Sequence, residues 1–379
     1  MPPSVSLIHQ ADYDPHGVYR AVREVVDLLG GMQRFVSPGE RILLKPNLLS
    51  PASPEKSITT HPAIVGAAME LVREAGGKPF IGDSPGMGTL IKAAERAGIK
   101  EVAEEGGVEL VEFDQPMQVE VPSGFRFRRI EVAEAALQAD GIINLPKLKT
   151  HSQMTLTLSV KNMFGCIPGR RKAQWHFQAG LNRDRFAEML VELYLIMKPR
   201  LNILDGILGM EGDGPGSEGR PRWMHLVAAG AEGVALDMVI AQLLGIPLPA
   251  IPTIKVAQEG GLSPFDPSQL EMKGESPMSL RPSSFLPPKS LDLGWGVPPF
   301  LHRILRGVLT ARPVIDAARC ALCQICSQAC PSEAIREEHG RLLIDPQKCI
   351  RCFCCQELCP EGAVKTQEGW AARWLGGRE

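Results

Sequence analysis

The chain has 379 residues, 44% hydrophobic and 22% charged, a balance typical of a globular protein large enough for two or three domains. Its net charge of −2 argues against bulk attraction to nucleic acid or to an anionic membrane. No basic run followed by an apolar core opens the chain, and no apolar stretch approaches the roughly 18 residues of a membrane span. We therefore expect a cytoplasmic protein without a transmembrane helix.

In the first two-thirds of the chain, segments with helical spacing of apolar residues alternate with short apolar runs that predict buried strands. The predicted helices are 19–29, 62–75, 89–97, 185–197 and 234–244. The predicted strands are 41–49, 78–81, 108–113, 141–145, 201–204 and 225–229. This alternation predicts an α/β domain over residues 1–262, with a mainly parallel sheet and helices on both faces.

Residues 263–312 have a different composition, with eight prolines between Pro264 and Pro299 and little periodicity. They predict an extended linker or a strap over the surface. A short amphipathic helix is expected over Phe300–Leu309, docking on the first domain rather than on a membrane. Residues 313–367 then form a small separate domain, followed by a tail over 368–379.

The small domain is defined by its cysteines, because nine of the ten in the chain lie between Cys320 and Cys359. Such clustering at one end of a long chain without an export signal favours metal ligation over disulfides. The cysteines form two copies of one pattern, C-x2-C-x2-C-x3-C-P, offset by 29 residues. The first copy starts at Cys320 and the second at Cys349.

This spacing predicts two [4Fe–4S] clusters, because three closely spaced thiolates wrap one cluster and the fourth cysteine reaches the other. One expected ligand set is Cys320, Cys323, Cys326 and Cys359. The other is Cys349, Cys352, Cys355 and Cys330. Zinc is the alternative, but zinc ribbons use two separated CxxC pairs and need neither the further cysteines nor the proline.

The pattern resembles that of bacterial-type two-cluster ferredoxins over about the last 60 residues, which implies a small α+β fold. Cys354, beside ligand Cys355, departs from the pattern. We interpret it as a small apolar filler rather than as a substitute ligand or a redox group.

Within the larger domain, several polar segments stand where a strand is predicted to end. The carboxyl ends of parallel strands converge on one crevice, which is the default ligand site. Lys45, Lys147, Lys149, Lys161 and the histidines His61 and His151 lie in these segments, and Arg170, Arg171 and Lys172 follow. Convergent cations suit a carboxylate or phosphate, and a buried lysine can act as an acid or base.

We therefore predict a catalytic group and a smaller cofactor-binding group, although each lysine can equally be a solvated strand end. The predicted catalytic residues are Lys45, Lys147, Lys149, His151 and Lys161. The predicted cofactor-binding residues are Asp83, Arg170 and Arg171.

Four residues or segments have alternatives that the sequence leaves open. His61 either caps the helix that starts at Pro62 or takes part in catalysis, and Asp83 either caps the next helix or holds a cation. The segment 209–219, with Glu211 and Asp213, is weakly suggestive of a phosphate or metal loop. Cys166 is interpreted as a buried structural thiol rather than a reactive one.

The polar segments, in this order, resemble those of the DUF362 family over roughly residues 5–260. They are Lys45-Pro46-Asn47, Thr60-His61-Pro62, Gly82-Asp83-Ser84-Pro85-Gly86, Asn144 to His151, Lys161-Asn162-Met163-Phe164-Gly165 and Asp205-Gly206. The resemblance implies an iron–sulfur-containing protein, often fused to a ferredoxin module, and no particular substrate. A more distant likeness to nickel-cofactor enzymes of the lactate racemase type has no single motif to carry it.

Together these features predict an iron–sulfur oxidoreductase or the electron-transfer partner of one. Two [4Fe–4S] clusters would exchange electrons with an anionic small molecule, or an unidentified organic cofactor, in the crevice. The expected partner is a redox protein or another low-potential electron donor. A maturation or assembly protein and a redox sensor are the alternatives from other classes.

Overall fold

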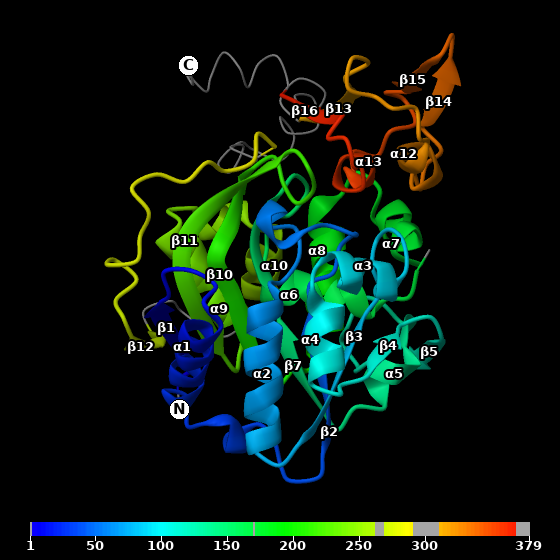
Figure 1. Cartoon of the computed structure of the whole chain (residues 1–379). Coiled ribbons are helices and arrows are strands. Elements are labelled where there is room, and N and C mark those ends of the chain that lie inside the picture. Colours follow the sequence, from blue (N-terminus) through cyan, green and yellow to red (C-terminus); the bar gives the residue numbers. More distant parts are fainter. Residues whose placement is uncertain (1, 170, 262–268, 291–310, 369–379) are drawn as a thin grey trace.

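The structure is a computed structural model that describes residues 2–169, 171–261, 269–290 and 311–368. They form an α/β domain and a small C-terminal module, drawn in orange and red at the top of Figure 1. In these described ranges no helix is long and apolar enough to cross a membrane.

A sheet of ten strands, counted over the described residues, forms the centre of the α/β domain. Eight strands follow in the order β12 (Glu271–Gly274), β1 (Ser4–His9), β11 (Gly219–Gly230), β10 (Leu201–Gly212), β7 (Gly141–Leu145), β2 (Arg41–Pro46), β3 (Lys78–Asp83) and β4 (Leu110–Glu112). Off this path, β8 (Lys147–His151) pairs with β10 and with β9 (Thr155–Thr157). Pairings are parallel from β10 to β4, and β11 is antiparallel to both its neighbours. The predicted fold class, a mainly parallel α/β sheet, is confirmed.

Helices cover both faces of this sheet (Figure 1). One face packs against α1 (Pro15–Asp27), α2 (Pro62–Glu74), α3 (Leu90–Arg96) and α4 (Ile99–Glu105). The other packs against α6 (Ser159–Asn162), α7 (Arg171–Ala179), α8 (Arg183–Met197), α9 (Gly233–Leu243) and α10 (Pro252–Glu259). Leu43 and Leu44 of β2 belong to different cores, because successive side chains of a strand point to opposite faces.

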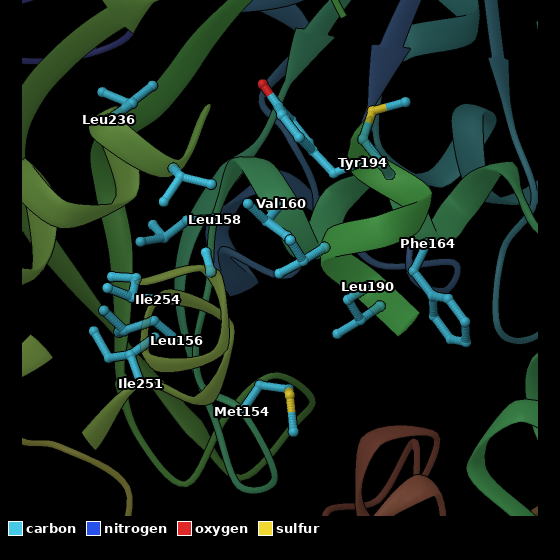
Figure 2. Packing of buried hydrophobic residues seen from close by; sticks show 14 of the residues in the cluster. Met154, Leu156, Leu158, Val160, Phe164, Leu190, Tyr194, Leu236, Ile251 and Ile254 are labelled. Atoms are coloured by element: carbon cyan, nitrogen blue, oxygen red, sulfur yellow. The ribbon is translucent and has the colours of Figure 1, made fainter. Parts of the chain in front are cut away.

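The core between the sheet and helices α6 to α10 contains residues far apart in the sequence. Figure 2 shows Leu190 of α8, Leu236 of α9 and Ile254 of α10 around Leu156 and Leu158, which flank the end of β9. Burial of this kind stabilises the fold by roughly 1.5–3 kcal/mol per large apolar side chain. It fixes the short segment that carries Lys161 against the sheet.

The remaining described elements are short. They are the hairpin of β5 (Pro116–Val119) and β6 (Ile130–Ala133), the helix α5 (Glu134–Leu137), and the 3-10 helices η1 (Met32–Arg34), η2 (Pro54–Lys56), η3 (Met163–Cys166) and η4 (Leu248–Ala250). Of these, η3 contains Gly165, which packs against polar groups described in the next subsection.

The structure differs from the sequence-based expectation in three places. The segment 147–151, expected as a polar loop beyond a strand, is the buried strand β8, because it pairs with β9 and β10. The strand expected over 201–204 extends to Gly212, because β11 continues to pair with it. In the linker, 271–274 forms the edge strand β12 beside β1, while the helix expected over Phe300–Leu309 lies outside the described residues.

The C-terminal module repeats one arrangement twice. It contains α12 (Ile325–Gln328) and α13 (Cys354–Glu357), one in each cysteine motif. Two antiparallel pairs join β13 (Arg312–Ile315) to β16 (Val364–Gln367) and β14 (Ile335–Glu338) to β15 (Arg341–Ile344). Its core consists of a few apolar side chains and the cysteines themselves, so the groups that the thiols hold contribute much of the interior.

Candidate functional site

Two buried ion pairs stand at the carboxyl edge of the sheet. Lys45, at the end of β2, lies 2.9 Å from Asp83, at the end of β3, and both side chains are almost fully buried. Gly165 packs on this pair, and a Cβ there would lie 2.5 Å from Lys45 Nζ, so only glycine fits. Because Asp83 also accepts hydrogen bonds from the backbone of Leu48 and Ser84, its carboxylate is fully used inside the protein.

The second pair joins Lys147 of β8 to Asp205 of β10 at 2.8 Å. Tyr13 contacts both partners: its hydroxyl donates to Asp205 at 2.6 Å and accepts from Lys147 at 2.8 Å. The ring of Tyr13 stacks on His61, with 3.5 Å between centroids. Sequence reasoning missed Tyr13, because it lies in a polar N-terminal loop far from every motif.

His61 caps helix α2, since its Nδ1 accepts a hydrogen bond from the backbone of Ala63 at 3.2 Å. Burial lowers the pKa of His61 to about 4, so the ring is neutral at physiological pH. This geometry matches the capping alternative.

Two further buried lysines, Lys149 and Lys161, have no carboxylate within salt-bridge distance among the described residues. Lys149 of β8 donates to Asn47 Oδ1 at 2.7 Å and to the carbonyl of Ile58 at 2.6 Å. Burial lowers its pKa to about 7 and lowers the pKa of Lys161 as well. In the part of the chain that the structure describes, Lys161 Nζ faces the ring of Phe164 at 4.8 Å and has no hydrogen-bond partner.

His151 is buried next to these lysines. Its Nδ1 accepts hydrogen bonds from the backbone of Gln153 and Met154, so the neutral ring carries its proton on Nε2. That Nε2 makes no hydrogen bond among the described residues, and neither does Nδ1 of buried His176. Burial lowers the pKa of both rings, His176 to about 3. Unpaired buried polar atoms are costly, which makes this spot a candidate for a bound polar group.

The predicted cofactor-binding arginines lie elsewhere or cannot be placed. Arg171 lies at the start of α7, where its Nε is 2.6 Å from Glu131, a partly exposed pair outside the buried lysine group. Arg170 lies outside the described residues. The next residue, Lys172, instead reaches inward to Ser84 Oγ at 2.8 Å. The sequence named Lys172 and Ser84 only as parts of longer segments.

Cys166 and the segment 209–219 take structural positions. Burial raises the pKa of Cys166 to about 12, so its thiol stays protonated. Glu211 and Asp213 form ion pairs with Arg222 and Lys289, both at 3.1 Å. The segment is the tip of the β10–β11 hairpin, with its carboxylates already paired.

The cysteines of the predicted ligand sets lie together in the C-terminal module. Cys320, Cys323, Cys326 and Cys359 line one cavity. Burial, and then the nearby thiols of Cys352, Cys349, Cys330 and Cys326, raise the pKa of Cys355, so the second set lies beside the first. Within the described residues, no three His, Cys, Asp or Glu side chains are close enough to hold a single metal ion.

The backbone turns in the same way around both cysteine sets and donates hydrogen bonds to their thiols. The residue just before the second cysteine of each motif has a positive φ, 54° at Leu322 and 53° at Arg351, so the backbone turns at the same place in both motifs. Ala334 N donates to Cys330 Sγ at 3.3 Å, and Ala363 N donates to Cys359 Sγ at 3.2 Å. The crowded thiols need positive charge to ionise together, and the iron atoms of an iron–sulfur cluster supply such charge.

The module docks with its second half on the carboxyl edge of the sheet. Figure 1 shows α13 on the side of the module that faces the α/β domain. Gln356 donates to the carbonyl of Asp213 at 2.9 Å, and Glu357 lies 3.9 Å from His151 Nε2. Ser217 donates to the carbonyl of Pro360 at 3.2 Å. The buried lysines and the second cysteine set thus share one interior region, which the sequence alone did not connect.

Comparisons with known proteins agree with these two parts. Residues 42–242 match the model of the Domain of unknown function (DUF362), and residues 312–360 match that of the 4Fe-4S dicluster domain. The thylakoid-associated protein sll1697 of Synechocystis sp. is 40% identical over 304 residues, which cover 80% of this chain and 92% of that protein. The lactate racemase apoprotein from Thermoanaerobacterium thermosaccharolyticum is 12% identical, with a TM-score of 0.41. That match covers 62% of this chain and only 56% of the racemase.

Proposed function

This chain belongs to the DUF362 family and is an iron–sulfur protein, and we propose that it transfers electrons through two [4Fe–4S] clusters to or from an anionic small molecule. The molecule would bind beside the buried lysines of the α/β domain. The resulting activity is that of an iron–sulfur oxidoreductase.

One observation supports this proposal above the others: α13, which carries a cysteine of the second set, is docked on the buried cations. Cys355 is buried in this helix, and its neighbour Cys354 lies near enough to Lys161 to influence its charge. Bound clusters would supply single electrons, and the chain's own groups would hold the molecule that receives them.

The proposed anion site lies between His151, Lys161 and Lys149. The Nε2–H of His151 and the ammonium of Lys161 are donors without partners among the described residues. The carboxylate of Glu357 faces these groups, 3.9 Å from His151 Nε2. A bound carboxylate or phosphate would satisfy both donors and offset the remaining excess of cations. Because an anion favours the charged form of lysine, its binding would also raise the pKa of Lys149 and Lys161.

The opposite side of the module offers a way in for electrons. Cys323 of the first set is exposed, and its neighbour Leu322 is 39% exposed. A redox partner protein or a low-potential donor can approach this corner, while Cys352 and Cys355 of the second set are buried. We therefore propose that electrons enter at the first set and leave at the second.

The test begins with anaerobic purification, iron and sulfide quantification, and EPR of the dithionite-reduced protein. We expect about eight iron and eight sulfide per chain and the signal of two interacting clusters. Zinc in place of iron, or iron near four per chain, would contradict the two-cluster assignment.

The anion site is tested on the same sample with oxalate and inorganic phosphate as probes. Either anion should change the EPR signal of the second cluster, and Lys161→Met should abolish the change. Lys100→Met, at a partly exposed pair with Glu104, is the control and should preserve it. An unchanged signal with both anions would argue against the site.

The name of the relative sll1697 refers to thylakoids, so a cytoplasmic location for this chain stays a prediction.

A further inference from the structure

Ser84 and Lys172 form a pair that electron transfer does not require. Ser84 lies in the turn that follows β3, and its Oγ is 2.8 Å from Nζ of Lys172 in α7. We propose that Ser84 is a nucleophile and Lys172 its general base, acting on an ester or thioester that carries an anionic group. This activity is separate from the proposed redox function.

The turn holds the Ser84 hydroxyl in place. The backbone N–H of Ser84 donates to Asp83 Oδ1 at 2.8 Å and to the carbonyl of Gly165 at 3.1 Å. Its Oγ accepts a hydrogen bond from the backbone of Gly169 at 3.0 Å. Since that lone pair is occupied by a backbone donor, the hydroxyl proton is free to be given to the lysine amine.

Lys172 is oriented by a third group, as a catalytic base must be. Its Nζ donates to the carbonyl of Ile167 at 2.7 Å, which leaves the nitrogen lone pair available toward Ser84. An amine–hydroxyl pair of this kind is an established variant of the serine nucleophile with its base.

The surroundings of Lys172 favour a neutral amine near physiological pH. Burial lowers its pKa to about 7. The charged or titratable groups that face it are Asp83 of β3, which raises the pKa, Lys45 of β2 and Lys161 of α6, which lower it, and the thiol of Cys166 in η3. At pH 7 about half of the molecules therefore carry the base in its active form.

The proposed reaction balances with water as the only co-reactant. Lys172 takes the proton of Ser84 as Oγ bonds to the carbonyl carbon, and the bond to the leaving oxygen or sulfur breaks as Lys172 returns that proton to it. Water then attacks the acyl group, Lys172 takes its proton, and the Oγ–carbon bond breaks as the proton returns to Ser84. An anionic group on the substrate is expected because Lys161, without a hydrogen-bond partner in the described residues, lies close enough to affect Lys172.

A fluorophosphonate probe tests the nucleophile directly, because a serine displaces fluoride from it and keeps the phosphonate. Intact-mass and peptide mass spectrometry should show one adduct, at Ser84. The labelling rate should rise with pH around a midpoint near 7, where Lys172 loses its proton. Ser84→Ala should give no adduct, while Ser50→Ala, which removes another serine that is 8% exposed, should label normally.

Lys172→Arg separates a base from a structural cation. Arginine keeps the charge and the hydrogen bonds but cannot act as a base, so labelling should fall about 100-fold or more, as with Lys172→Met. Iron content and the EPR spectrum of each variant show that it is folded, and they report on the redox proposal independently. Absence of a Ser84 adduct in the native protein, or normal labelling of Lys172→Arg, would overturn the proposal.

Discussion

The two cysteine motifs of the C-terminal module have the same spacing but different surroundings. In the first, the second cysteine is Cys323, which is exposed; its equivalent in the second motif, Cys352, is buried. The helix of the first motif ends in Ser327-Gln328, whereas that of the second ends in Gln356-Glu357. Of these, Gln356 donates to the carbonyl of Asp213 and Glu357 approaches His151, both in the α/β domain.

This difference indicates how one repeated motif can serve two tasks. The potential of an iron–sulfur cluster depends on nearby charge and on solvent exposure. The outer set, Cys320 to Cys326 with Cys359, is open to a partner. The inner set, with Cys355, is close to buried cations that favour an added electron. We expect the inner cluster to have the higher potential.

The largest expected effect comes from removing one ligand from each set. Cys326→Ala and Cys355→Ala stand at equivalent positions, and each should lose about half of the iron. Cys359→Ala should give the same residual EPR spectrum as Cys326→Ala, because Cys359 lines the outer cavity although it belongs to the second motif. Cys354→Ala is the control and should keep all the iron. A spectrum of Cys359→Ala that matches Cys355→Ala would refute the crossed assignment.

The next effect concerns the contact that makes the inner set different. A Cβ at Gly216, in the β10–β11 loop, would lie 2.5 Å from the carbonyl oxygen of Glu357. Gly216→Val should therefore displace the module, at a cost of roughly 1–3 kcal/mol, and expose the inner thiols. The measurement is the rate at which an iron chelator removes the inner cluster.

Gly39→Ala provides a control for lost stability alone. Gly39 has a φ of 86° and no atom that a Cβ would meet, so alanine is strained there without touching the module. It should lower the melting temperature but leave iron removal unchanged. Equal chelation rates in Gly216→Val and the native protein would mean that docking does not protect the inner set.

A smaller effect is expected from the charge of Lys161. A unit charge about 10 Å away contributes roughly 1 to 2 kcal/mol at an effective dielectric constant near 20, or roughly 40 to 90 mV for one electron. Lys161→Met should lower the potential of the inner cluster by about this amount and leave the outer one unchanged. Lys161→Arg should largely restore it. An EPR-monitored redox titration measures both clusters, and equal shifts in the two would contradict the comparison.

The smallest effect belongs to the rim of the docking surface. Arg319 forms a partly exposed pair with Glu218 at 2.8 Å, and Arg336 pairs with Glu338 inside the module at 2.9 Å. Arg319→Ala should weaken docking by less than about 1 kcal/mol, and less at high salt. Arg336→Ala should have no effect on docking. A loss as large as that of Gly216→Val would mean that the rim, not the buried contact, holds the module.

Much of the α/β domain followed from the sequence because local patterns and burial agree there. The strand 141–145 and the helix start at Pro62 appear where apolar periodicity and proline place them. Tyr13, β8 and β12 were missed for one reason. Their structure depends on partners distant in the chain, Asp205, β10 and β1, and no local pattern announces such a partner.

The cysteine spacing alone predicted the two ligand sets, because metal ligation depends on short spacings that are visible in the sequence. The sequence also placed lysines near strand ends. Only the tertiary structure decided which lysines are paired with Asp83 and Asp205 and which remain without a carboxylate, and it alone brought Lys172 to Ser84. The tertiary structure likewise decided which of the two motifs of equal spacing faces the α/β domain. That choice depends on contacts such as the one between Gln356 and Asp213, which are 143 residues apart.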